Sequence, residues 1–123
     1  MAEQRLVELD DGGAVSIVEV GSGHPLIVLH GGPGLDHHYF RPWLDPLGEQ
    51  GFRVIYVDMR GQGASPRVDA ATLSIAVFVQ DVDRLARALE LGEFALLGHS
   101  FGAIVSLGHA LQSGSAAQYV ISH

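Results

Sequence analysis

A serine lies between two glycines in Gly98-His99-Ser100-Phe101-Gly102, which fits the pattern G-x-S-x-G. The segment follows a short apolar run and precedes an amphipathic one, so it predicts a tight strand-to-helix turn with Ser100 at its apex. Such a turn holds the serine in a strained, exposed conformation, near free N–H groups and the positive end of the helix dipole. The pattern therefore predicts a nucleophilic serine. The alternative is a serine that only caps a helix.

A glycine-rich loop, HGGPG at residues 30–34, follows an earlier apolar run. Acyl transfer needs two hydrogen-bond donors aimed at the developing oxyanion. We expect these donors to be the N–H groups of Gly32 and Phe101, because glycine lets the backbone approach a substrate closely. A plain strand-to-helix turn is the alternative. A phosphate loop is excluded because no Lys-Ser or Lys-Thr follows, and Gly61-Gln62-Gly63 lacks the third glycine of a dinucleotide site, so no cofactor is expected.

The elements that must position these loops follow from the hydrophobic pattern. Continuous apolar runs bounded by glycine-rich loops indicate buried parallel strands, and an apolar stripe with a 3.6-residue repeat indicates a helix over 72–91, with Asp81 on its polar face and Gly92 at its C-terminal cap. The fold class is therefore α/β, with one domain over residues 1–123. The predicted elements are a hairpin of strands over 5–9 and 14–20, strands over 26–29, 54–57, 94–97 and from 119, a broken helix within 36–50 and a helix over 100–111.

Composition excludes several classes of function. The 123 residues carry a formal net charge of −7 and no run of Lys or Arg, which argues against nucleic-acid binding. The absence of cysteine removes disulfides, thiolate nucleophiles and Cys-ligated zinc. An acidic N-terminus and the lack of any stretch near the ~20 apolar residues of a membrane span lead us to expect a soluble, cytoplasmic protein without membrane contact.

The motifs together resemble the α/β-hydrolases, and within them the proline iminopeptidase-like branch. HGGPG, the segment DMRGQGAS at residues 58–65 and GHSFG occur in that family's order. The resemblance implies a three-layer sheet that begins with an antiparallel hairpin, Ser100 as catalytic nucleophile, Gly32 and Phe101 as oxyanion hole, and a site shaped by the residues His30, Gly31, Gly98, His99 and Gly102. Proline iminopeptidases usually carry Gln in place of Met59 and Trp in place of Phe101. Epoxide hydrolases are similar but use an aspartate where Ser100 stands.

The family's catalytic acid and histidine follow the nucleophile, yet no Asp or Glu follows Ser100 here. His109 lies inside the predicted elbow helix and is interpreted as a packed or surface residue, and His123 is the last residue. His37 and His38 could reach the site entrance, but without a third ligand we expect no metal site. The resemblance therefore implies that the acid, the base and the lid lie in a C-terminal half outside this chain, whose length is about half that usual for the family.

Two hypotheses follow. The first is the N-terminal half of a serine hydrolase for an ester or an N-terminal amide, aminopeptidase-like, inactive as an isolated chain. The second is a non-catalytic domain that binds a ligand or a protein and keeps the hydrolase fold. Either one would have a small molecule or short peptide as ligand. An apolar strand from Tyr119 at the sheet edge predicts a complementary polypeptide or self-association.

Overall fold

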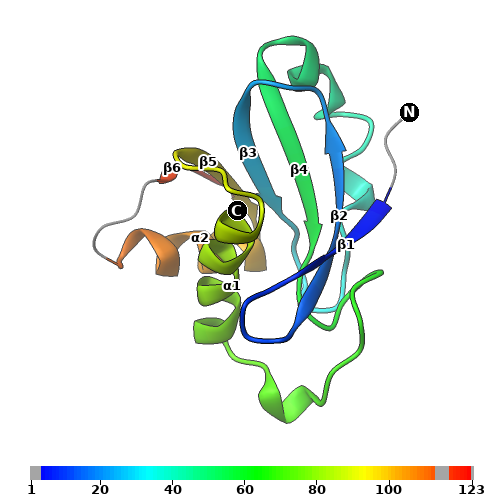
Figure 1. Cartoon of the computed structure of the whole chain (residues 1–123), viewed down its shortest axis with the longest axis vertical. Coiled ribbons are helices and arrows are strands. Elements are labelled where there is room, and N and C mark those ends of the chain that lie inside the picture. Colours follow the sequence, from blue (N-terminus) through cyan, green and yellow to red (C-terminus); the bar gives the residue numbers. More distant parts are fainter. Residues whose placement is uncertain (1–3, 113–116, 123) are drawn as a thin grey trace.

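The computed structural model describes residues 4–112 and 117–122, which form one open six-stranded sheet with the order β1-β2-β4-β3-β5-β6 (Figure 1). β1 pairs antiparallel with β2, and β2 antiparallel with β4, while all later pairs are parallel. This arrangement confirms the predicted hairpin followed by parallel strands. The strands are β1 (Gln4–Glu8), β2 (Ala14–Val20), β3 (His24–Leu29), β4 (Phe52–Asp58), β5 (Phe94–His99) and β6 (Ala117–Ser122).

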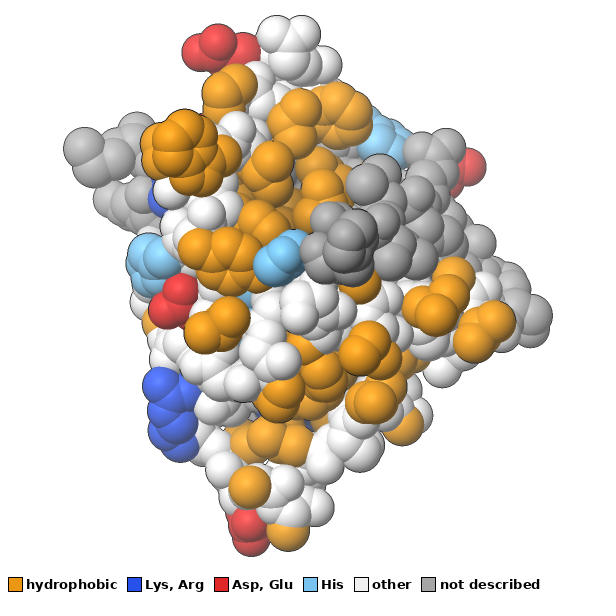
Figure 2. Space-filling model, turned by 180° about the vertical axis from the view of Figure 1, so that it is seen from behind, with side chains coloured by type: hydrophobic (Ala, Val, Ile, Leu, Met, Phe, Trp, Pro, Cys, Tyr) orange, Lys and Arg blue, Asp and Glu red, His pale blue; other side chains and the backbone are white. Residues whose placement is uncertain are grey.

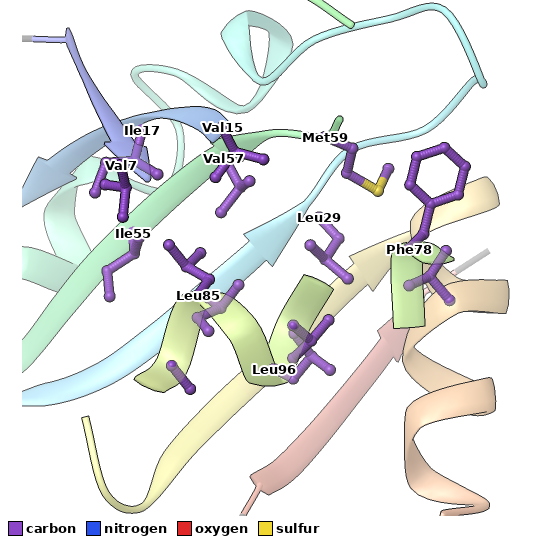
Figure 3. Close-up of a cluster of buried hydrophobic side chains, with 14 of the residues drawn as sticks. Val7, Val15, Ile17, Leu29, Ile55, Val57, Met59, Phe78, Leu85 and Leu96 are labelled. Carbon is purple, nitrogen blue, oxygen red and sulfur yellow. The ribbon is translucent and has the colours of Figure 1, made fainter. Parts of the chain in front are cut away.

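The two faces of the sheet bury different partners because successive strand residues point to opposite sides. One face packs against α1 (Ile75–Ala88) and the N-terminal half of α2 (Phe101–Ala110). Figure 3 shows this cluster, in which Leu29, Ile55 and Leu96 of the sheet surround Leu85 of α1. The opposite face is covered by Phe40, Leu44 and Leu47 from the connection between β3 and β4. The central strands are thus buried on both sides, as their continuous apolar runs predict.

The connection over 36–50 contains two short 3-10 helices, His38–Phe40 and Asp45–Glu49, which agrees with the predicted broken helix. Proline at positions 42 and 46 removes two backbone donors, so an α-helix cannot run through this segment. A third 3-10 helix, Ala70–Thr72, precedes α1. None of the helices in the described part of the chain is long and apolar enough to cross a membrane.

α1 begins later than the apolar stripe predicts. Ser74 has extended backbone angles, and its hydroxyl accepts a hydrogen bond of 3.2 Å from the Val77 N–H, so the helix begins at Ile75 instead of Thr72. Ile75, which the periodicity places on the buried stripe, is 48% exposed. The cap, rather than the hydrophobic pattern, sets the first turn.

The predicted cap at Gly92 is also wrong. Glu90 adopts the left-handed conformation, with φ of 55°, and the Leu91 N–H donates to the Ala86 carbonyl at 3.0 Å. This is the bonding pattern of a Schellman cap, which ends α1 at Ala88. Glu90 takes the left-handed position that glycine usually occupies in such a cap. The glycine at position 92 therefore places the predicted helix end two residues too late.

Asp81 does not lie on an exposed polar face, as the periodicity predicts, because it is 8% exposed and paired. Its carboxylate accepts two hydrogen bonds from Arg60, of 2.9 and 2.7 Å, and one of 3.0 Å from Arg84. Arg60 also reaches Asp11 in the hairpin turn, at 2.9 Å. A Cβ at Gly13 would lie 2.5 Å from the Arg60 guanidinium, so glycine there makes room for the bridge. The pair ties the hairpin to α1.

Candidate active site

Ser100 lies at the junction of β5 and α2 with φ of 55° and ψ of −115°. L residues adopt such angles rarely, and the surrounding packing must hold them in place. Although Ser100 occupies the N-terminal cap position of α2, its side chain accepts no cap hydrogen bond, and the residue is exposed. The geometry is that of a sharp strand-to-helix turn that presents the hydroxyl to solvent, which a simple helix cap does not require.

The two glycines of GHSFG are needed because backbone atoms crowd them. A Cβ at Gly98 would overlap the Gly102 carbonyl oxygen and the Ser106 hydroxyl. A Cβ at Gly102 would overlap the Leu29 carbonyl oxygen and lie 2.7 Å from the His30 carbonyl oxygen. The first turn of α2 therefore lies directly against the end of β3. A side chain at either glycine would prevent this close contact.

The glycine loop after β3 contacts the serine turn. Gly31 is buried, and a Cβ there would lie 3.2 Å from the Ser100 Cβ. Gly32 is exposed with φ of 123°. Neither the Gly32 N–H nor the Phe101 N–H donates a hydrogen bond to another described residue. Two backbone donors thus lie on the two segments that meet at Ser100.

Tyr39, which the sequence motifs do not include, joins the two segments. Its hydroxyl accepts a hydrogen bond from the Gly31 N–H at 2.6 Å and lies 2.9 Å from the His99 Nδ1. Its ring stacks on Phe40, with centroids 4.4 Å apart. Tyr39 belongs to a 3-10 turn without hydrophobic periodicity, so no pattern in the sequence separates it from an ordinary surface aromatic.

His30 is fully buried, and both of its ring nitrogens are occupied. Its Nδ1–H donates to the Gly31 carbonyl at 2.7 Å, because a carbonyl can only accept, and its Nε2 accepts from the Met59 N–H at 3.0 Å. Burial lowers the pKa of His30 below its ordinary value. The neutral imidazole joins the loops after β3 and β4 and has no free nitrogen for proton transfer.

His37 does not reach the site entrance, contrary to the sequence-based interpretation. It is 2% exposed, and its Nδ1–H donates to Asp58 at 2.7 Å. Asp58 is also fully buried and accepts from the Ala64 N–H at 3.0 Å and the His37 N–H at 2.9 Å. Burial opposes ionisation of Asp58, but hydrogen bonds from the His37 ring and these N–H groups outweigh it and lower its pKa to about 2. The carboxylate at the end of β4 thereby anchors both adjoining loops.

Gln62 and Ser65 complete the bracing of this edge. The Gln62 Oε1 accepts from the Gly34 N–H at 2.7 Å, which fixes the far side of the glycine loop. The Ser65 hydroxyl donates to the Asp58 carbonyl and accepts from the Ser16 N–H of β2 at 2.8 Å. The segment DMRGQGAS is thus a framework that holds HGGPG in place, a role that its sequence pattern alone does not reveal.

Comparison with known proteins agrees with this architecture. The family model described as alpha/beta hydrolase fold matches residues 24–120. This chain belongs to the α/β-hydrolase fold family. A proline iminopeptidase from Clostridium botulinum is 36% identical over 93 residues, which make up 75% of this chain and 31% of that protein.

Solved structures of other α/β-hydrolases superpose closely. A proline iminopeptidase-related protein from Thermus thermophilus gives a TM-score of 0.82 at 36% identity, over 92% of this chain and 41% of that one. An epoxide hydrolase from Vigna radiata gives a TM-score of 0.88 at 30% identity, over 98% of this chain and 38% of that one. The matched residues of this chain cover 31% and 39% of the length of the first two curated relatives, both proline iminopeptidases, so the chain spans less than half of each.

Two more of the described histidines of this α/β-hydrolase chain bond to carboxylates, and His24 begins β3 at the opposite edge of the sheet from Ser100. His38 pairs with Asp36 at 3.0 Å, and the buried His109 on α2 lies 2.7 Å from Asp83 of α1. His109 is thus a packed residue, as predicted, whereas His123 lies outside the described residues. Among the described residues, no side chain forms a hydrogen bond with the Ser100 hydroxyl, and no group of three His, Cys, Asp or Glu could hold a metal ion.

Proposed function

We propose that this chain carries the nucleophile and the oxyanion hole of a serine hydrolase that acts on an ester or an N-terminal amide. Ser100 attacks the substrate carbonyl carbon, and the N–H groups of Gly32 and Phe101 stabilise the oxyanion. The observation that carries the proposal is the positive φ of an exposed serine whose hydroxyl is not used as a helix cap. The family similarity to proline iminopeptidases supports an aminopeptidase-like substrate.

The proton acceptor for Ser100 is part of the proposal. His30 has no free nitrogen, and four further described histidines bond to Tyr39 or to carboxylates. The sixth, His24, begins β3 and so lies at the opposite edge of the sheet from Ser100. We therefore place the base histidine and its orienting acid outside the described residues, on a complementary polypeptide. A serine without a positioned base is a weak nucleophile.

Labelling with a fluorophosphonate probe tests the nucleophile. The chain is incubated with the probe, and the site of modification is read by peptide mass spectrometry. We expect slow modification at Ser100, none in Ser100→Ala, and unchanged modification in Ser106→Ala, which removes a buried hydroxyl of the same helix. Modification that persists in Ser100→Ala would refute the assignment.

Hydrolysis of p-nitrophenyl acetate and of proline p-nitroanilide measures the catalytic activity of the isolated chain. With the oxyanion hole but without a described base, we expect no more than the residual acceleration of ~10³ to 10⁴ over water that remains in hydrolases whose triad is removed. That residual rate comes from the oxyanion hole and binding, so Ser100→Ala should leave it nearly unchanged. Adding the complementary polypeptide should restore turnover, and Ser100→Ala should abolish the restored turnover. Restored turnover that survives in Ser100→Ala would refute the serine as nucleophile, and no restoration at all would favour the alternative, a non-catalytic domain with a hydrolase fold.

A further inference from the structure

Tyr39 contacts both halves of the proposed site through one oxygen atom. The Gly31 N–H can only donate, so the Tyr39 oxygen accepts at 2.6 Å. The phenolic hydrogen is then available for the His99 Nδ1, 2.9 Å away, although the same oxygen could also accept from an Nδ1–H. The donor count thus fixes the direction from Gly31 to Tyr39, and the direction from Tyr39 to His99 is part of the inference.

The inferred direction of the second bond determines the tautomer of His99. If Tyr39 donates, the Nδ1 accepts and the neutral imidazole carries its hydrogen on Nε2. Ring contacts hold the imidazole in the same place, since Tyr39 and Phe40 both meet it edge to face, with centroids 5.5 and 6.2 Å away. His99 directly precedes Ser100 and is only partly buried. Its orientation is therefore set by the 3-10 turn that follows the glycine loop.

We propose that Tyr39 is a positioning residue of the oxyanion hole, which holds the Gly31–Gly32 peptide against the Ser100 turn and selects the Nε2–H form of His99. The proposal rests on the proposed function, because an oxyanion hole needs a nucleophile. Gly31 would meet Ser100, Tyr39 and His99 if it had a Cβ, at 3.2, 3.2 and 3.5 Å, so the four residues form one compact contact. Without the hydroxyl, the Gly31 N–H loses the partner that fixes the adjacent Gly32 donor.

Tyr39→Phe removes the hydroxyl and keeps the ring that stacks on Phe40. Tyr56→Phe is the matched control, because it also removes one hydroxyl and one hydrogen bond, to Asp45 at 2.6 Å. Nitrogen-15 NMR reads the tautomer of His99 and the amide proton of Gly31. We expect the Nε2–H form and a downfield Gly31 amide in the wild type and in Tyr56→Phe, and a mixture of tautomers with an upfield Gly31 shift in Tyr39→Phe. A purely structural tyrosine would leave the tautomer unchanged.

Phenylboronic acid at alkaline pH tests the oxyanion hole, because its tetrahedral adduct with Ser100 forms there as bulk hydroxide takes up the proton of the serine hydroxyl. Removal of one oxyanion donor costs ~10²- to 10³-fold in rate, so its displacement in Tyr39→Phe should weaken boronate affinity by about tenfold, with Tyr56→Phe unchanged. Ser100→Ala should lose binding altogether. Should Ser100→Ala bind like the wild type, the proposed function fails and so does the oxyanion role of Tyr39. Wild-type affinity in Tyr39→Phe, with Ser100 required, would overturn the inference about Tyr39 alone, as would an unchanged His99 tautomer.

Discussion

Single residues at the carboxyl edge of the sheet act mainly by fixing loops. His30 and Asp58 are both fully buried, and the hydrogen bonds of their side chains join one of these loops to another or close a loop on itself. Neither is available to move a proton at Ser100. The histidine and the aspartate of the recognisable motifs therefore serve the geometry of the site, and the proposed chemistry rests on the serine and the backbone donors.

Asp58 gives a prediction about acid stability. Its pKa is lowered from 3.8 to about 2 in the folded chain, so the unfolded chain takes up the proton first as pH falls. The stabilisation is complete above the unfolded value and is lost as pH falls through the folded value, and the shift corresponds to about 2 kcal/mol. Between pH 5 and pH 3 the wild type should lose about 1 kcal/mol more than Asp58→Asn, measured from urea unfolding at each pH. Parallel losses in the two proteins would contradict the hydrogen-bonded carboxylate.

At the scale of elements, the sequence predicts types better than ends. Apolar runs identify β3, β4 and β5 because a strand that is covered on both faces buries every side chain and is therefore apolar along its whole length. The ends of α1 depend on single residues, the side chain of Ser74 and the left-handed backbone of Glu90, whose capping roles do not follow from periodicity. Asp81 is buried because Arg60, 21 residues earlier, meets it there. Pairing over such a distance leaves no local signal.

The same limit applies to the site. The elbow and the glycine loop were predictable because their spacing and their position after apolar runs carry a physical requirement. Tyr39 and the buried state of His37 were not, since each depends on a partner on another element, Gly31 in one case and Asp58 in the other. Local patterns show which loops carry chemistry, and the three-dimensional contacts show what holds them.

The junction of β3 and α2 gives a prediction about packing. Gly102→Ala places a methyl group against the Leu29 and His30 carbonyl oxygens, and backbone at the sheet centre cannot move away cheaply. We expect a loss of about 3 kcal/mol in the free energy of unfolding. Gly108→Ala on the same helix meets only a Val79 methyl at 2.9 Å and gains helix propensity, so it should cost no more than about 1 kcal/mol. Equal urea midpoints for the two variants would show that the elbow packs more loosely than described.

In the molecule as a whole, the loops with chemical interest gather at one edge. The strands β3, β4 and β5 are parallel neighbours, so their carboxyl ends place HGGPG, DMRGQGAS and GHSFG side by side. Ligands of open α/β sheets bind at this edge. Apolar side chains are also widely spread over the face of the molecule seen in Figure 2.

Two unpartnered features lie at one end of the described sheet. β6 is the last strand in the sheet order and has β5 as its one neighbour there. On the adjacent helix, Ile104 and Leu107 are 52% and 53% exposed, and Leu111 just beyond the helix end is 81% exposed. Residues spaced by three and four positions lie on one helix face, so these side chains form an apolar stripe. An open strand edge beside an apolar helix face favours pairing with another polypeptide.

We therefore predict that the chain, alone in solution, self-associates through this end of the sheet. Light scattering at tens of micromolar should give a mass above that of the 13.1 kDa monomer. The double variant Leu107→Glu, Leu111→Glu should shift the mass toward the monomer, because charges on the stripe would have to be buried without partners on association. Val68→Glu, which changes an apolar residue that is 39% exposed in a loop away from α2, should leave the mass unchanged. A monodisperse monomer of the wild type would show that neither the strand edge nor the stripe drives association, and the complementary polypeptide would lose its main structural support.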